Sequence, residues 1–156
     1  MGKSAFTFAS TMREHDDPTD ARGWTNVLAE VPLFASLSAR QRRKVSAVAR
    51  IRRFSDGAPF IRAGEAADAL FVLLDGEASV RQSGRRSLSL GVGSIIGELA
   101  ILDGGPRTAT VVAKGPIVAL TITGRAFRKL LRSEPTIAIA VAEELARRLR
   151  TAQATH

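Results

Sequence analysis

The chain has 156 residues and a net charge of +8; 45% of its residues are hydrophobic and 24% are charged. This length is sufficient for one domain with its own hydrophobic core. The absence of cysteine excludes disulfides, iron–sulfur ligation and thiol catalysis, and the two histidines, His15 and His156, lie near opposite ends, so we expect no metal site. No apolar run approaches the roughly 20 residues of a membrane-spanning helix, so we expect no membrane segment.

The positive charge is concentrated in two segments. Residues 40–62 carry eight basic side chains and one acidic one, residues 125–150 carry seven and three, and residues 63–124 are nearly neutral. A basic surface is often simply solvated, but it also attracts polyanions. We therefore keep one alternative function, a basic interaction module that binds a protein or a nucleic acid through Arg40–Arg53.

The first 23 residues show no apolar periodicity and contain the turn sequence Asp16-Asp17-Pro18. We expect residues 1–23 to be a flexible N-terminal segment and residues 24–156 to form the domain. Because the N-terminal segment has no apolar stretch typical of a secretory signal, we expect a cytoplasmic protein.

A helix is predicted after a short apolar group near the start of the domain. Ser38 and Gln41 match a capping box, and the helix should continue to about Ala49. At helical spacing, Val45, Val48 and Ala49 should face the core, and Arg40, Arg42, Arg43 and Lys44 should face outward.

From Ile51 onward, short apolar runs alternate with turn residues, which is typical of antiparallel strands. The glycine dipeptides Asp75-Gly76 and Gly115-Pro116 are two of the turns that separate these runs. The predicted strands are Ile51–Phe54, Phe60–Arg62, Leu70–Leu74, Glu77–Gln82, Ser87–Leu90, Thr108–Val112 and Ile117–Ile122. Their even spacing indicates an antiparallel β-roll or jelly roll.

Two helices are predicted at the C-terminal end. Thr123 can cap a helix that continues to Arg132, and Pro135 suits the first turn of a second helix that ends near Arg150. One side of the second helix is apolar, through Ile137, Val141, Leu145 and Leu149. The predicted fold is therefore mainly β with flanking helices: the roll, an N-terminal helical segment, one short helix within the roll and two C-terminal helices.

The glycine-rich stretch Gly91–Val111 interrupts the strands with that short helix and carries the candidate site. Gly97 precedes the helical turn, so the free backbone N–H groups of residues 98–100 can bind an anion. The planar guanidinium of Arg107 can hold two phosphate oxygens. Glu98 is a lone carboxylate among apolar residues, so it should face a hydroxyl donor such as a ribose 2′-OH rather than another charge. Together these groups indicate a nucleotide monophosphate site.

This stretch resembles the phosphate-binding cassette of cyclic nucleotide-binding domains, which occur in catabolite-activator-type regulators, cyclic-nucleotide-gated channels and cyclic-nucleotide-dependent kinases. The matching residues are Gly97-Glu98-Leu99-Ala100, Pro106-Arg107-Thr108-Ala109, Gly64-Glu65, Asp75-Gly76 and the segment Leu145–Leu149. The resemblance extends from about Leu28 to Arg150. Ile96 departs from the pattern, because the family often has Phe there.

The resemblance implies a ligand, cAMP or cGMP, and a role for each matching residue. Glu98 would accept a hydrogen bond from the ribose 2′-OH, and Arg107 would pair with the cyclic phosphate. The implied ligand-binding set is Gly97, Glu98, Leu99, Ala100, Arg107, Thr108 and Ala109, with the backbone amides of Gly97, Leu99 and Ala100 holding phosphate and ribose. The Thr108 hydroxyl permits cGMP without requiring it. Either Arg147 or Arg148 is a candidate lid residue over the purine.

Each site residue also has a purely structural interpretation. Glu98 could be an exposed carboxylate that complements the helix dipole, and Arg107 could form an ion pair with Asp103. An enzyme is not expected, because the predicted strands contain no histidine cluster for a metal and no nucleophile with an adjacent base.

The expected function is that of a stand-alone, non-enzymatic sensor module that repositions its C-terminal helix. It needs no cofactor besides its nucleotide ligand and has no DNA-binding domain in this chain. We expect it to be a monomer or a weak homodimer that acts on a protein effector.

Overall fold

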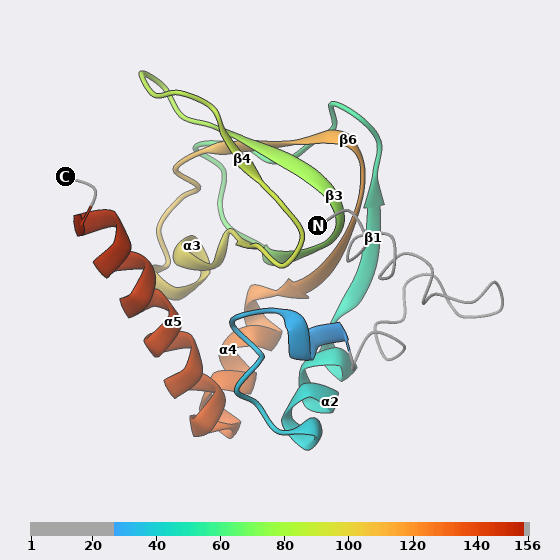
Figure 1. Cartoon of the computed structure of the whole chain (residues 1–156), viewed down its shortest axis with the longest axis vertical. Helices are drawn as coiled ribbons and strands as arrows, with labels where there is room; N and C mark the ends of the chain where they lie inside the picture. The colour runs from blue at the N-terminus through green and yellow to red at the C-terminus, as the bar shows by residue number, and fades with distance from the viewer. Residues whose placement is uncertain (1–26, 155–156) are drawn as a thin grey trace, which may run out of the picture.

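A computed structural model describes residues 27–154, which form an antiparallel β-roll with helices at one end and along one side (Figure 1). The elements are η2 (Val27–Glu30), α2 (Ala39–Val48), β1 (Arg50–Phe54), β2 (Pro59–Ile61), β3 (Ala69–Arg81), β4 (Leu88–Leu90), β5 (Ile95–Ile96), α3 (Glu98–Asp103), β6 (Thr110–Thr123), α4 (Gly124–Ser133) and α5 (Pro135–Ala154). This order confirms the predicted fold class. The expected flexible segment, residues 1–23, lies outside the described residues. Within residues 27–154, no helix is both long and apolar enough to cross a membrane.

Two long strands, β3 and β6, form the centre of the six-stranded sheet. They pair antiparallel from Ala69 opposite Thr123 to Arg81 opposite Thr110. Strands β1 and β2 pair with β6, and β4 and β5 pair with β3. Because β5 pairs with the beginning of β3, the sheet also fixes the position of the helix α3 that follows β5.

Four of the predicted strands merge into two. Strand β3 joins the predicted strands Leu70–Leu74 and Glu77–Gln82, and β6 joins most of Thr108–Val112 to Ile117–Ile122. The glycine dipeptides between them are bends within continuous strands, because a shift of register lets the ladder continue through each bend. Strand β5, Ile95–Ile96, was not predicted, since two residues are too few to show an alternating pattern.

Gly76 makes the bend of β3 possible. Its φ of +88° lies in the left-handed region that favours glycine. A Cβ atom added there would lie 2.5 Å from the carbonyl oxygen of Pro116 and 2.9 Å from Cγ2 of Ile117. The absence of a side chain at Gly76 therefore allows β3 to approach β6 where both strands bend.

Both predicted helix starts are confirmed. The Ser38 hydroxyl accepts a hydrogen bond from the Gln41 N–H at 3.2 Å, and the Gln41 side chain accepts one from the Ser38 N–H at 2.8 Å. The Thr123 hydroxyl accepts from the Ala126 N–H at 3.2 Å. These contacts satisfy N–H groups that have no partner within the helix. Helix α5 continues beyond its predicted end at Arg150.

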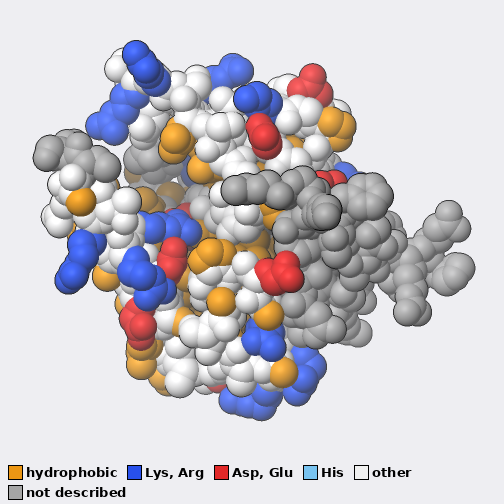
Figure 2. Space-filling view, in the orientation of Figure 1, with side chains coloured by type: hydrophobic (Ala, Val, Ile, Leu, Met, Phe, Trp, Pro, Cys, Tyr) orange, Lys and Arg blue, Asp and Glu red, His pale blue; other side chains and the backbone are white. Residues whose placement is uncertain are grey.

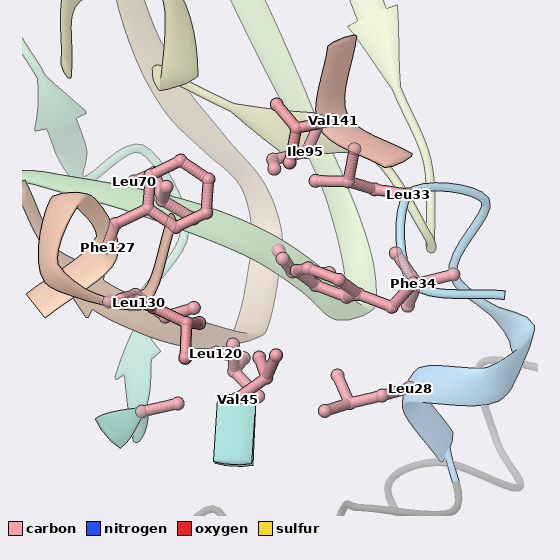
Figure 3. Close-up of a cluster of buried hydrophobic side chains, with 14 of the residues drawn as sticks. Leu28, Leu33, Phe34, Val45, Leu70, Ile95, Leu120, Phe127, Leu130 and Val141 are labelled. Carbon is pink, nitrogen blue, oxygen red and sulfur yellow. The ribbon is translucent and has the colours of Figure 1, made fainter. Parts of the chain in front are cut away.

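The larger hydrophobic core lies between the helices and the closed end of the roll (Figure 3). Phe34 and Phe127 are fully buried in it. A smaller cluster inside the roll contains Phe54, Phe60 and Phe71, whose ring centroids are 5.0 Å apart for the first two and 5.1 Å apart for the last two. The two clusters fill opposite faces of β3, as alternation along a strand requires.

Two residues expected in the core are exposed. Val48, at the end of α2, is 40% exposed, although Val45 is buried. Leu149 is 61% exposed, whereas Val141 on the same side of α5 is buried. The first half of α5 packs on the core and its second half extends alongside the roll (Figure 1), so the apolar stripe of α5 is buried only in part.

Three of the four basic side chains of α2, those of Arg40, Arg43 and Lys44, are exposed as predicted, whereas Arg42 is half-buried and donates a hydrogen bond to the Leu37 carbonyl. The exposed Arg40 and Lys44 both form ion pairs with Glu134, which lies between α4 and α5. The hydrogen bond from Lys44 is the main reason that the pKa of Glu134 is lowered. In Figure 2, Lys and Arg side chains form separate groups around the visible face rather than one continuous patch.

We expect Gly76→Ala to lower the free energy of unfolding by about 3 kcal/mol, because it combines left-handed backbone strain with a clash in a packed bend. The matched control is Gly84→Ala. Gly84 has a φ of +74°, but a Cβ there would meet no atom within 4 Å, so we expect a loss of only about 1 kcal/mol. Urea unfolding of the two variants measures the difference. Equal losses would contradict the role assigned to the close approach at Gly76.

Candidate functional site

A cavity of about 190 Å³ opens between the roll and α3. Its lining combines apolar strand residues with the glycine-rich segment. The lining residues are Ile61, Val80, Leu90, Ile95, Ile96, Gly97, Glu98, Leu99, Ala100, Thr108, Ala109 and Val111. Six of the seven predicted ligand-binding residues therefore line one cavity. Figure 2 shows a hollow in the surface beside the far end of α5.

Arg107, the seventh predicted residue, lies directly behind this lining. It is only 6% exposed, and its Nη1 donates a hydrogen bond to the Gly97 carbonyl at 2.8 Å. Its Nη2 donates to the Ala69 carbonyl and lies 3.7 Å from the carboxylate of Asp68. Burial is the main cause that lowers the pKa of Arg107, and the charge of Asp68 opposes it. The ion-pair partner is thus Asp68, and the alternative pairing with Asp103 is wrong.

The glycine before α3 is required by this arrangement. Gly97 has a φ of +86°, and a Cβ there would collide with Nη1 of Arg107 and lie 3.0 Å from Cδ1 of Ile61. The missing side chain lets the guanidinium reach the backbone at the start of α3.

The upstream Gly64-Glu65 turn holds the same arginine by its backbone. The Arg107 N–H donates to the Glu65 carbonyl at 2.9 Å, and the Gly64 N–H donates to the Arg107 carbonyl at 2.8 Å. Two motif segments more than 40 positions apart in the sequence therefore form one hydrogen-bonded unit.

Glu98 is buried and paired with a cation. It is 7% exposed, and its Oε1 lies 2.6 Å from Nη1 of Arg148 in α5. The expectation that Glu98 faces a hydroxyl rather than another charge is therefore wrong, and so is the alternative of an exposed carboxylate. Burial raises the pKa of Glu98, while a hydrogen bond to its own backbone N–H and the charge of Arg148 oppose that rise.

The two candidate lid arginines have different surroundings. Arg147 is exposed and its Nη2 lies 2.9 Å from the Glu144 carboxylate. Arg148 contacts Glu98, and its Nε lies 3.5 Å from the other Glu144 oxygen. Among the described residues, the cavity lining contains none from α5, so neither arginine belongs to the cavity wall. Sequence reasoning missed the Glu98–Arg148 pair because fifty residues separate its members and no local pattern links them.

Thr108 and Leu99 are the exposed members of the site. Thr108 lines the cavity with its side chain accessible, and Leu99 is 61% exposed at the first turn of α3. An accessible hydroxyl beside a buried guanidinium suits a ligand that carries an anion, and an exposed leucine offers apolar contact at the rim.

The fold agrees with the comparison to known families. The cyclic nucleotide-binding domain family matches residues 51–134, more than half of the chain. The chain belongs to the cyclic nucleotide-binding domain family, a regulatory ligand-binding family rather than a catalytic one.

The similar proteins are longer. A cAMP-dependent protein kinase regulatory subunit of Mycosarcoma maydis is 37% identical over 80% of this chain and 25% of its own length. A cyclic nucleotide-gated potassium channel of Mesorhizobium japonicum is 34% identical over 75% of this chain and 32% of its own length. The chain thus spans about a quarter to a third of these curated relatives.

Solved structures with the same fold include the catabolite activator protein of Thermus thermophilus, with a TM-score of 0.72 and 29% identity over 80% of this chain and 61% of that one. The regulatory domain of Toxoplasma gondii PKA, solved with cAMP, has a TM-score of 0.71 and 25% identity over 82% of this chain and 50% of that one.

We expect Arg107→Ala to destabilise the protein by about 3 kcal/mol, because the buried carbonyl of Ala69 and the half-buried carbonyl of Gly97 lose their donor. Arg86→Ala, which removes an exposed arginine from the β3–β4 connection, should change stability by less than about 0.5 kcal/mol. Chemical denaturation of both variants tests this expectation. If the two variants were equally stable, the carbonyl contacts of Arg107 would not support the fold.

Proposed function

We propose that this chain binds cAMP or cGMP in the cavity between the roll and α3 and acts as a regulatory module through its C-terminal helix. The observation that carries the proposal is the joint placement of a buried guanidinium, a buried carboxylate and an uncapped glycine start of α3 around one cavity, in a chain of this family.

Arg107 is the proposed phosphate ligand. A guanidinium has five N–H donors, and the carbonyls of Gly97 and Ala69 use two of them. The remaining donors, together with the backbone N–H groups of Leu99 and Ala100, supply hydrogen bonds to a cyclic phosphate. Because Arg107 is already fixed by the protein, little side-chain entropy is lost when the phosphate binds.

Glu98 is the proposed ribose ligand, and the apolar strand residues are the proposed contact for the base. Glu98 lines the cavity, so its carboxylate is within reach of a sugar hydroxyl there. Val80 and Leu90 belong to the apolar part of the lining, which suits a planar purine. Thr108 adds an accessible hydroxyl that can serve either purine.

The names of similar proteins support both nucleotides. They include cAMP-dependent kinase regulatory subunits and a cGMP-dependent protein kinase of Toxoplasma gondii, which is 31% identical over 78% of this chain. Because these relatives carry further segments, we propose that the output of this module passes to a protein effector, and that the chain itself binds without catalysing a reaction.

The alternative function, binding of a protein or nucleic acid through Arg40–Arg53, has less support. Arg40 and Lys44 both pair with the carboxylate of Glu134, Arg42 donates to a backbone carbonyl, and Arg52 lies 4.8 Å from the centre of the Phe54 ring, so part of the basic set already has partners within the chain. Tight binding of a polyanion that weakens steeply with salt would favour this alternative over the nucleotide site.

We expect calorimetry to detect saturable binding of cAMP or cGMP, and the 2′-deoxy form of the preferred nucleotide to bind roughly 10-fold more weakly, since a hydrogen bond to a charged group is lost. In Glu98→Ala the two forms should bind with nearly equal affinity, because both members of the pair are then missing. Additive losses from the two changes would contradict ribose recognition by Glu98.

We also expect hydrogen exchange to slow in residues 142–154 when the nucleotide binds to the full chain. This half of α5 contributes no residue to the buried core, whereas Ile137, Ala140 and Val141 anchor the first half. Weakly packed segments have low local stability and respond most to a ligand. The internal control is residues 135–141, whose exchange should change little. Unchanged exchange in both halves would mean that α5 does not respond to the ligand.

A further inference from the structure

We propose that Arg148 is a positioning residue for ribose recognition: from α5 it holds the Glu98 carboxylate in place at the cavity wall without entering the cavity. This inference rests on the proposed function and deepens it, because it names the contact through which the nucleotide site and α5 influence each other.

The first observation is the position of the two partners relative to the cavity. Glu98 belongs to the cavity lining and Arg148 does not, although Nη1 of Arg148 lies 2.6 Å from Oε1 of Glu98. The Glu98 side chain is 9% exposed and that of Arg148 is 38% exposed. The guanidinium therefore approaches the carboxylate from outside the cavity and leaves the ligand's space free.

The second observation is that Arg148 is itself oriented. Its Nε lies 3.5 Å from Oε1 of Glu144, one turn earlier on α5. The other Glu144 oxygen accepts hydrogen bonds from Arg147. Four charged side chains from α3 and α5 thus form one chain of contacts, and Glu98 is its only member in the cavity lining. Such a chain restricts the rotamer of Glu98 before a ligand arrives.

The electrostatic surroundings of Glu98 support the same role. The charged groups near it are Arg148 on α5, with Glu144 behind it, and Arg107 from the segment before β6. Burial raises the pKa of Glu98, and Arg148 is the nearest charge that opposes this rise. Without Arg148 the carboxyl would take up a proton at a higher pH, and a neutral acid accepts a hydrogen bond less strongly than a carboxylate.

The proposal also gives α5 a defined response. A ribose hydroxyl that binds Glu98 while Glu98 is paired with Arg148 favours the state in which this ion pair is formed. The reason is that one carboxylate accepts hydrogen bonds from both the hydroxyl and Arg148. Linkage then requires that docking of the far half of α5 and binding of the ribose strengthen each other by the same factor.

Two other roles for Arg148 predict different results. If Arg148 competed with the ribose for Glu98, its removal would strengthen cyclic nucleotide binding. If Arg148 moved over the purine as a lid, its removal would weaken ribose and 2′-deoxyribose forms equally, because the base is the same in both.

The test is calorimetric titration of the full chain with cAMP, cGMP and the 2′-deoxy forms, for wild type, Arg148→Gln, Arg148→Lys and the control Arg150→Gln. Arg150 is an exposed arginine on the same helix, so its variant removes the same charge without touching Glu98. We expect Arg148→Gln to weaken binding of the ribose form about 10-fold, the usual effect of one charge-assisted contact, and to change binding of the 2′-deoxy form less than twofold. Arg148→Lys should restore part of the loss, and Arg150→Gln should bind as wild type does.

The pH profile gives a second measurement, which a purely structural effect would not move. Binding of the ribose form should decline as the pH falls through the raised pKa of Glu98, and the midpoint of this decline should lie at a higher pH in Arg148→Gln than in wild type. Thermal unfolding checks that the variants are folded. Should Arg148→Gln fail to fold, Arg148→Lys tests the same prediction, because it keeps the positive charge but removes the guanidinium N–H that donates to Glu98.

Three results would overturn the inference while leaving the proposed function intact. Arg148→Gln could bind the ribose form more strongly than wild type, or it could bind the ribose and 2′-deoxyribose forms with an equal loss. It could also show the affinities and the pH midpoint of wild type. Failure of wild type to bind any of the four nucleotides would overturn the proposed function and this inference with it. The two failures are therefore distinguishable from the wild-type titration alone.

Discussion

The buried guanidinium of Arg107 connects three parts of the chain that would otherwise be held together only by packing. Its side chain joins the carbonyl before α3 to the carbonyl at the beginning of β3, and its backbone pairs with the Gly64-Glu65 turn. A buried charge is costly unless it is paired and hydrogen-bonded, and the two carbonyls together with the nearby Asp68 carboxylate reduce this cost for Arg107. The absent side chain of Gly97 is one condition of this arrangement.

The same contacts explain how a structural residue can also be a ligand residue. Arg107 lies behind the cavity wall, and its guanidinium is held in one orientation by two carbonyls. The cavity in front of it is lined mainly by apolar residues. In such surroundings an anion interacts with a fixed charge more strongly than it does in water. Under the proposed function, stability and binding depend on the same residue, so a substitution there must be judged by measurements of both.

Helix α5 combines two different kinds of packing. Its first half, through Ile137 and Val141, belongs to the main core, whereas its second half meets the site through Arg148 and Glu98. Apolar packing fixes the first half in place, and an ion pair with a half-exposed arginine is easier to rearrange.

The sequence by itself determined the fold class and the helix starts at Ser38 and Thr123, because capping and alternation are local properties of the chain. Its resemblance to the phosphate-binding cassette of a known family pointed to six of the residues that line the cavity. Only the tertiary structure decided that the bend at Gly76 continues a strand, since the ladder with β6 holds the chain on both sides of it. It alone brought Arg148 to Glu98, because a contact across fifty residues depends on where α5 lies against α3. Local signals specify the elements and their turns; the partner of a buried charge is specified by packing between elements.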